Sequence, residues 1–291
     1  ENLRKLHPRR LPIICASLAF VLYGNTIFTG GFVWDDRAAV LSNPDVLSTR
    51  DFRELWANDF WGQDMTLDDS HKSYRPLAVL SLRFNYSVYG LKPHGYHFEN
   101  VLLYSAICYL YSELSGKLKK QCFGEKQGCP HLSMWIASIL FAIHPIHTEV
   151  VASIVGRSDL LCALFYLLSI NLYIQATDAR YKSKESFACL EKWVVFAASI
   201  VAAFCSSLSK ELGVTVFGVH IANEVICSFI SYSYASSEST KEQKVQLAHA
   251  KHDNNFFFGG TINQNMAIIG HGRHHSFFCI LFERHRLVRM L

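Results

Sequence analysis

Six apolar runs constrain the fold of this chain more than any other feature of its sequence. Several are about 17 to 19 residues long, roughly 26 to 28 Å of helix, which is near the lower limit for crossing a bilayer. Such short spans suit a thin membrane, such as that of the endoplasmic reticulum. The sequence therefore predicts an all-α chain folded as a polytopic membrane helix bundle. The runs occupy residues 11–28, 98–114, 132–150, 159–175, 193–208 and 212–230.

The composition supports the same class of protein. Half of the 291 residues are hydrophobic and 18 % are charged, whereas about a quarter of the residues are charged in a typical soluble domain. The formal net charge is only +4, and no acidic or basic block indicates a nucleic-acid partner. Five of the nine cysteines lie inside apolar runs, and residues 30–97 contain none. We therefore expect no nucleic-acid partner and no disulfide scaffold.

Lysine and arginine alternate along the segments that connect the runs. Four such residues lie in each of three segments, residues 1–10, 115–131 and 176–192. The two short connecting segments, residues 151–158 and 209–211, carry one each, Arg157 and Lys210. Short loops rich in Lys and Arg stay in the cytosol. The pattern predicts a cytosolic N-terminus over residues 1–10 and a membrane domain over residues 11–230, with a luminal first loop at 30–97.

The first loop contains a second helical pattern, residues 51–61, with the sequence DFRELWANDFW. An amphipathic helix with this aromatic content lies in the membrane interface. Packing against a soluble luminal partner is the alternative interpretation. The apolar residues at helical spacing are Phe52, Leu55, Trp56 and Phe60.

Ionisable side chains gather at the predicted luminal ends of the runs. Charge is costly to bury near a bilayer, so such groups mark a candidate site by default. One luminal cavity is expected to collect them. They are Asp35 and Asp36 after the first run, Lys72 and Arg75 before the second, His144, His147 and Glu149 at the end of the third, Arg157 and Asp159 at the start of the fourth, and Lys210 and Glu211 between the last two.

Asp35 and Asp36 are the candidates for catalysis. Like charges at close range push one pKa up, so two adjacent carboxylates can divide into an ionised base and a hydrogen-bonded helper. A carboxylate held near a hydroxyl can then act as a general base. The alternative is that one of them caps the turn that follows, and the pair alone does not decide between these interpretations.

The basic groups also have two interpretations each. Lys72 and Arg75 are suited to bind an anionic head group, or they face lipid phosphates. Lys210 and Glu211 are the two polar residues between the last two runs. Adjacent opposite charges more often neutralise each other than bind a substrate.

His144, His147 and Glu149 offer three potential zinc ligands. Pro145 follows the first of them and places a kink at the end of the run. A hydrogen-bonded polar cap is therefore the favoured interpretation, and no metal site is predicted.

Five ordered stretches bring a known family into view: FVWDD, NDFWG, SHKSYRPLAVLSLRFNY, HPIHTEVVASIVGRSDLLCALFYLLS and SKELGVTVFG. Together they closely resemble the transmembrane and tetratricopeptide-repeat containing (TMTC) protein O-mannosyltransferases. The resemblance covers residues 11–230. Long matches in the same order at five places are far more specific than one short motif.

The resemblance implies a GT-C type glycosyltransferase of the endoplasmic reticulum membrane with an acidic motif in its first luminal loop. It implies dolichyl phosphate mannose as donor and Ser or Thr hydroxyls of luminal proteins, cadherins among them, as acceptors. The motif falls on Asp35 and Asp36, and Asp35 is favoured as base with Asp36 as its orienting partner. The leaving phosphate needs positive charge, and no cofactor is evident, while the metal requirement stays open. The candidates for that charge are Lys72, Arg75, Arg157 and Lys210.

The chain also departs from this family. No 34-residue helix-pair repeat follows residue 230, and residues 231–291 form a polar, irregular tail that is expected to be disordered. Residue 1 is Glu rather than Met, so we expect a fragment of a longer product. The alternatives to an active transferase are a catalytically inactive membrane scaffold or truncated isoform and, less favoured, a transporter.

Overall fold

Helices dominate the part of the chain that the structure describes. The computed structural model describes residues 10–123, 131–177, 186–230 and 232. Within these residues the only pairing of extended backbone is an isolated bridge between Asn58 and Asp64. The chain divides into two units, residues 1–220 and 221–291. The predictions for residues 1–9 and for nearly all of 231–291 lie outside the described residues.

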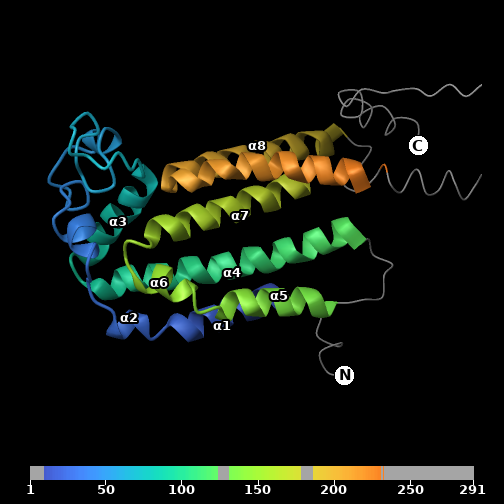
Figure 1. The fold of residues 1–291 in the computed structure, drawn as a ribbon, viewed down its shortest axis with the longest axis horizontal. Helices are drawn as coiled ribbons and strands as arrows, with labels where there is room; N and C mark the ends of the chain where they lie inside the picture. The colour runs from blue at the N-terminus through green and yellow to red at the C-terminus, as the bar shows by residue number, and fades with distance from the viewer. Residues whose placement is uncertain (1–9, 124–130, 178–185, 231, 233–291) are drawn as a thin grey trace, which may run out of the picture. The chain divides into compact units, whose positions relative to one another are not determined.

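The helices of the first unit run alongside one another, with a loop region at one end (Figure 1). Helix α7 packs against α8 and α4, and α4 packs against α1. The elements are α1 (Leu11–Tyr23), α2 (Thr26–Thr29), α3 (Pro76–Tyr89), α4 (Pro93–Phe123), α5 (His131–Ile143), α6 (His147–Ala152), α7 (Arg157–Thr177) and α8 (Ser186–Ser209).

Four helical segments are long and apolar enough to cross a membrane. They are Leu11–Thr29, Arg157–Thr177, Leu190–Ser209 and Glu211–Ile230. Each coincides with a run predicted from the sequence. The all-α, polytopic helical class is therefore confirmed.

The remaining two runs differ from the prediction. The run at 98–114 lies inside α4, which continues to Phe123 and so takes in part of the predicted loop at 115–131. The run at 132–150 is interrupted, because α5 ends at Ile143 and α6 begins at His147. Pro145 causes this break, since proline disfavours helical backbone in the residue before it and lacks an N–H. The division into about six spans stays a prediction.

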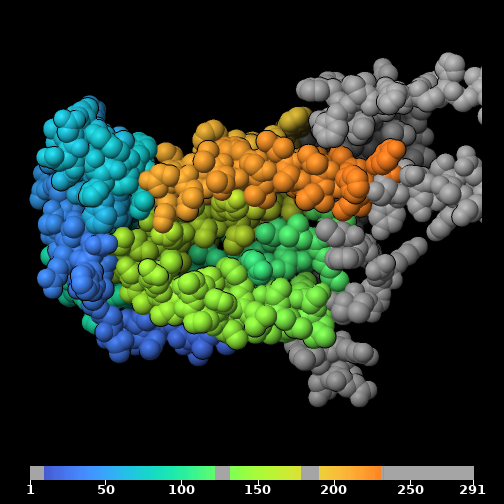
Figure 2. Space-filling view, viewed as in Figure 1, coloured from blue at the N-terminus to red at the C-terminus, as the bar shows by residue number. Residues whose placement is uncertain are grey.

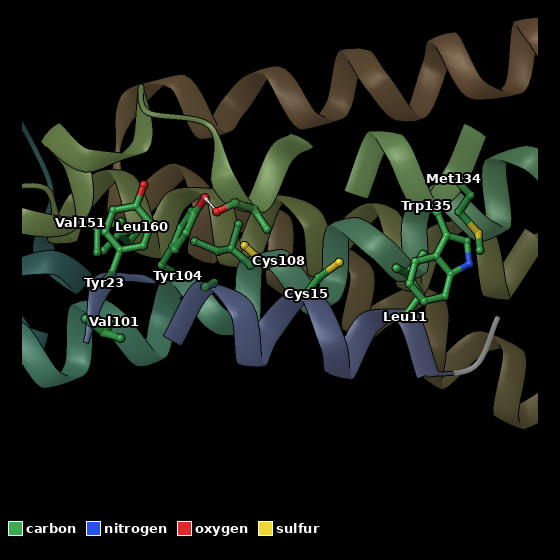
Figure 3. Packing of buried hydrophobic residues seen from close by; sticks show 13 residues of the cluster. Leu11, Cys15, Tyr23, Val101, Tyr104, Cys108, Met134, Trp135, Val151 and Leu160 are labelled. Carbon is green, nitrogen blue, oxygen red and sulfur yellow. Dashed lines mark hydrogen bonds between the residues drawn. The ribbon is translucent and has the colours of Figure 1, made fainter. Parts of the chain in front are cut away.

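The broken end of α5 is stabilised by tyrosines from two other helices. The Tyr104 hydroxyl of α4 lies 3.1 and 3.2 Å from the carbonyl oxygens of Phe141 and Ala142 and donates to them. Such carbonyls at a helix end have no partner within the helix. Tyr23 of α1 packs edge-on against Tyr104, with ring centroids 5.1 Å apart. Figure 3 shows these rings in the buried cluster between α1, α4 and α5, which also contains Cys15 and Cys108.

The amphipathic helix predicted over residues 51–61 is wrong. Only Glu54–Trp56 forms a short 3-10 turn. Two aspartates compete with a helix here, because Asp51 accepts from the Arg53 N–H at 3.0 Å and Asp59 accepts from the Trp61 N–H at 2.9 Å. The apolar residues are divided accordingly: Leu55 and Phe60 are buried, whereas Phe52 and Trp56 are exposed.

The helix that the first loop does form is α3. Pro76 occupies its first turn, where the missing N–H costs nothing. It ends at Gly90, whose φ of 59° favours glycine. Ala78, Val79 and Leu82 of α3 are buried in a cluster with residues of the first loop. Figure 2 shows the first loop and α3, in blue to cyan, as one continuous mass at an end of the helices.

Candidate functional site

The carboxylate of Asp36 joins the first loop to the connector between α6 and α7, residues 153–156. Asp36 is fully buried. Its Oδ2 accepts from the Val33 N–H at 3.0 Å, and its Oδ1 accepts from the Val155 N–H at 2.9 Å. Both oxygens are thus committed to backbone amides. Asp36 precedes the single turn Arg37–Leu41, but its side chain does not cap it.

Asp35 has a different environment from its neighbour. Its side chain is exposed, while its carbonyl accepts from the Ala39 N–H at 2.9 Å. The backbone around Asp35 is therefore held at both ends, by this bond and by the amide bonds of Asp36. One member of the acidic pair is a buried anchor, and the other presents a carboxylate to the outside on a fixed turn.

A buried histidine lies beside the anchor. Burial raises the pKa of Asp36, opposed by its amide hydrogen bonds and by the nearby His97. His97 is 1 % exposed, and burial lowers its pKa. Its Nε2 lies 3.3 Å from the Gly31 carbonyl oxygen. A Cβ at Gly30 would lie 2.4 Å from the same nitrogen, so this close approach requires glycine.

Arg157 forms the centre of a buried polar network at the start of α7. Its side chain is fully buried. The Nε donates to Asn100 Oδ1 at 2.6 Å, and the Nη2 donates to the Tyr96 carbonyl at 2.9 Å. The planar guanidinium matches such a fixed set of acceptors. Its Nη1 reaches three further oxygens, on Ser81, Asn85 and Glu99, at 2.7, 2.8 and 3.0 Å.

This geometry differs from the predicted role of Arg157 as a phosphate ligand. A buried cation is stable only when it is paired and hydrogen-bonded, and Glu99 supplies the opposite charge at 3.0 Å. All three guanidinium nitrogens already have acceptors. Arg157 therefore holds α3, α4 and α7 together instead of presenting a free cation.

The same network fixes the connector that binds Asp36. Asn100 donates to the carbonyl oxygens of Val151 and Ser153, at 3.3 and 2.8 Å, on the chain leading into the connector. The Arg157 N–H donates to the Ile154 carbonyl at 3.0 Å. These bonds tie the connector to α4 and to the start of α7. The Val155 amide is thus held in place from both sides before it meets Asp36.

Arg75 forms an ion pair at the same end of the bundle. Its Nε and Nη2 each lie 3.2 Å from a carboxylate oxygen of Glu211, in a bidentate arrangement. Its Nη1 lies 3.5 Å from the Ser158 hydroxyl oxygen, and the guanidinium lies 5.4 Å from the centre of the Phe60 ring. The Arg75 side chain is 19 % exposed. It remains reachable from outside, unlike Arg157.

A second ion pair lies next to the first along the chain. The Lys210 ammonium lies 2.6 Å from Asp159 Oδ1. Lys210 does not pair with its neighbour Glu211, as the sequence suggested, because Glu211 binds Arg75. The Ser158 hydroxyl links the Arg75 pair to the connector, since it donates to the Val155 carbonyl at 3.3 Å.

Lys72 turns its charge toward its own loop. Its Nζ donates to the carbonyl oxygen of Met65 at 2.7 Å and also to that of Leu67. The Lys72 backbone has a φ of 56°, which is uncommon for a residue other than glycine. The structure does not place it in contact with Arg75 or with the acidic pair.

The side chains of the three residues at the end of the third run do not form a metal site. His147 packs between the rings of Phe141 and Tyr104, at centroid distances of 4.7 and 5.2 Å. His144 Nδ1 accepts from the Ile146 N–H at 3.2 Å. Glu149 is exposed. Among the described residues, no group of three or more His, Cys, Asp or Glu is arranged to hold a metal ion.

Some residues of the site were not predicted from the sequence. Glu99 and Asn100 lie at the start of the second apolar run, where a charged residue and an amide signal a buried partner. That signal does not identify Arg157 as the partner. For His97 and Trp34, the sequence offers no indication of a role except their position, next to the second run and next to the acidic pair, respectively.

The fold and the site define a class: a multi-pass helical membrane protein with an exposed carboxylate on a turn held by hydrogen bonds, and with accessible ion pairs. Known proteins then specify the family. The chain is 38 % identical over 226 residues to Protein O-mannosyl-transferase TMTC4 of Homo sapiens, covering 76 % of this chain and 30 % of that protein. Over this matched region, the chain belongs to the TMTC family of protein O-mannosyl-transferases.

Other relatives support this assignment. Protein O-mannosyl-transferase tmtc2 of Xenopus laevis is 42 % identical over 213 residues, covering 73 % of this chain and 24 % of that protein. Protein O-mannosyl-transferase Tmtc3 of Drosophila melanogaster is 32 % identical over 258 residues, covering 81 % and 27 %. The chain thus spans under a third of the length of these relatives. No family model and no solved structure matches the chain.

Proposed function

We propose that this chain is the part of a membrane glycosyltransferase that carries its catalytic acid motif. The reaction is the transfer of mannose from dolichyl phosphate mannose to Ser or Thr hydroxyls of luminal proteins, with cadherin-type proteins among the acceptors. The proposed location is the endoplasmic reticulum membrane, with a cytosolic N-terminus and residues 30–97 in the lumen. The names of the relatives support mannosyl transfer to protein.

The observation that carries the proposal is that the two adjacent aspartates have different environments. Asp36 is buried and has both oxygens committed to amides. Asp35 is exposed on the turn that these bonds fix. A general base must reach its substrate and be held in position. Asp35 meets the first requirement, and Asp36 provides the second.

The chemistry is a single displacement at the anomeric carbon. The acceptor hydroxyl oxygen forms a bond to that carbon while Asp35 accepts the hydroxyl proton. The bond between the anomeric carbon and the phosphate oxygen breaks on the opposite face, and dolichyl phosphate leaves with the electron pair. No covalent sugar adduct on the protein is required.

The leaving phosphate is assigned to Arg75 and Lys210. Both cations are partly accessible, with side chains 19 % and 22 % exposed. Each already has a carboxylate partner, Glu211 or Asp159, which a phosphate would replace or share. Fixed positive charge at this point stabilises the charge that develops on the leaving group. Arg157 is assigned a structural role because it is fully buried, and Lys72 because its ammonium donates to carbonyl oxygens of its own loop.

Two single substitutions test this assignment in cells that lack the endogenous enzymes. Asp35→Asn removes the base and leaves the turn intact, so we expect loss of mannose transfer to a cadherin domain with normal expression and membrane insertion. Asp36→Asn places an amide N–H₂ against a backbone N–H, so we expect loss of transfer together with reduced stability. Transfer by the unmodified chain is the positive control. If it shows none, or if Asp35→Asn matches it, the proposal is wrong.

A further inference from the structure

Trp34, beside Asp35, is the most exposed large apolar side chain that the structure describes. It is 91 % exposed. Its indole makes no ring contact and no hydrogen bond within the described residues. Tryptophan is usually well buried, because its large apolar surface is costly to leave in water. Trp34 therefore contributes nothing visible to the packing of the fold.

The backbone of Trp34 is also in an unfavourable conformation. Its φ is 43°, one of three positive values among the described residues other than glycine. A bulky residue in this region is strained and persists only where its surroundings enforce it. Here they do: the Asp36 N–H donates to the Val33 carbonyl at 2.9 Å and Asp36 Oδ2 accepts from the Val33 N–H at 3.0 Å. The Arg37 N–H also donates to the Trp34 carbonyl at 3.1 Å.

Anchoring in the membrane interface would explain exposure alone. Phe28 is 79 % and Val33 is 49 % exposed, and both are apolar residues close to the end of the first span. An interfacial anchor, however, does not need a strained backbone or the rigid turn that carries the candidate base. The strain, the exposure and the adjacency to Asp35 together favour a ligand at the reacting centre.

We propose that the indole of Trp34 is a stacking platform for the hexose ring of the polyprenyl-phosphate donor. This inference rests on the proposed function and deepens it. One face of a pyranose ring carries C–H groups with partial positive charge, and the face of an aromatic ring carries negative charge. Stacking on Trp34 orients the sugar next to Asp35, while the phosphate lies with the cations. Trp34 thereby contributes to recognition of the sugar and not of the lipid.

Binding measurements test the platform without requiring transfer. The full chain is reconstituted in lipid nanodiscs and titrated with two probes: mannosyl phosphate on a short polyprenyl chain, and the same polyprenyl phosphate without sugar. We expect Trp34→Ala to weaken binding of the mannosyl probe about tenfold and to leave binding of the sugar-free probe unchanged. Trp34→Phe, which keeps an aromatic face, should retain most of the affinity.

Two further variants control for folding and for the membrane. Trp34→Gly removes the indole and favours a positive φ, so it should show the same selective loss with an unchanged or higher melting temperature. Phe28→Ala removes an exposed aromatic ring near the same membrane boundary and should affect neither probe. Selective loss with both Trp34→Ala and Trp34→Gly supports the platform.

Equal weakening of both probes, or of neither, would overturn the inference. The same holds if the unmodified chain does not prefer the mannosyl probe. A failure of the proposed function has a different signature. In that case the unmodified chain transfers no mannose, yet the selective effect of Trp34 on donor binding persists.

Discussion

At the scale of single residues, this site depends on buried charges that are fully partnered. Arg157 reaches five acceptors at 3.0 Å or less while completely buried. Asp36 holds two backbone amides. In such surroundings the removal of one partner costs more than the pair contributes, because the other is left buried without a partner.

Arg157→Lys is expected to destabilise the fold strongly. A lysine ammonium has three donors on one atom and cannot span the acceptors on α3 and α4. We expect a loss of about 3–5 kcal/mol in the free energy of unfolding, as for other broken buried pairs. Chemical unfolding of the purified protein in detergent measures it. Arg53→Lys, at an exposed position, is the matched control, and equal stabilities of the two variants would contradict the prediction.

His97 should make stability depend on pH. Burial lowers its pKa, so its stabilising contribution is complete above its ordinary value of about 6.5 and is lost as the pH falls through the lowered pKa. Asp36 acts in the opposite sense. Its pKa is raised in the folded chain, so its protonation as the pH falls stabilises the folded state.

Replacement of His97 isolates its part of this dependence. As the pH is lowered from about 7.5 to about 5, the unmodified chain should lose more unfolding free energy than His97→Gln does. Unfolding curves at a series of pH values measure that difference. If the unfolding free energies of the two proteins change in parallel with pH, His97 is not the source of the pH dependence.

At the scale of elements, the connector at residues 153–156 decides the geometry of the acidic turn. It joins two helices, receives hydrogen bonds from Asn100 and Arg157, and offers the Val155 amide to Asp36. The connector is short and tight. A Cβ on Gly156 would lie 2.1 Å from the Val150 carbonyl oxygen, and that oxygen belongs to backbone that cannot move freely.

Gly156→Ala is therefore expected to displace the connector. Overpacking of this kind costs about 1–3 kcal/mol, and the shift should also reduce transfer by loosening the turn that carries Asp35. Gly31→Ala is the matched control near the same site, because nothing lies within 4 Å of its Cβ position. Melting temperature and mannose transfer are measured for both. A normal melting temperature for Gly156→Ala would refute the prediction.

At the scale of the whole molecule, the proposed function requires that the acidic loop face the compartment that holds the donor. The distribution of Lys and Arg predicts a luminal position for residues 30–97. Four helices are suited to cross a membrane, but their orientation depends on flanking charge and not on packing.

Insertion of glycosylation acceptors tests this orientation. Acceptors placed at exposed sites of the first loop, such as next to Asp68, should be modified in cells, whereas acceptors in residues 1–10 should remain unmodified. Mobility before and after deglycosylation reports the result. Modification of the N-terminal acceptor alone would show the reverse topology and exclude a luminal role for Asp35.

The sequence by itself determined the class of this protein. Runs of apolar residues, with almost no charge inside them, can satisfy their backbone in a bilayer only as helices. The acidic pair and most of the polar groups near it were also visible, because ionisable residues at the ends of apolar runs are rare without a reason.

Only the tertiary structure decided what each of these groups does. Arg157 and Arg75 have the same chemistry and were both predicted to lie on the luminal side, yet one is fully buried and the other is accessible. Asp35 and Asp36 are neighbours with the same chemistry, yet Asp36 is buried against the Val155 amide, 119 residues away along the chain, and Asp35 is exposed. The aromatic pattern at 51–61 failed because local aspartate hydrogen bonds and the burial of Phe60 overrode its helical spacing. Burial and long-range partners, which no local pattern contains, assign the roles.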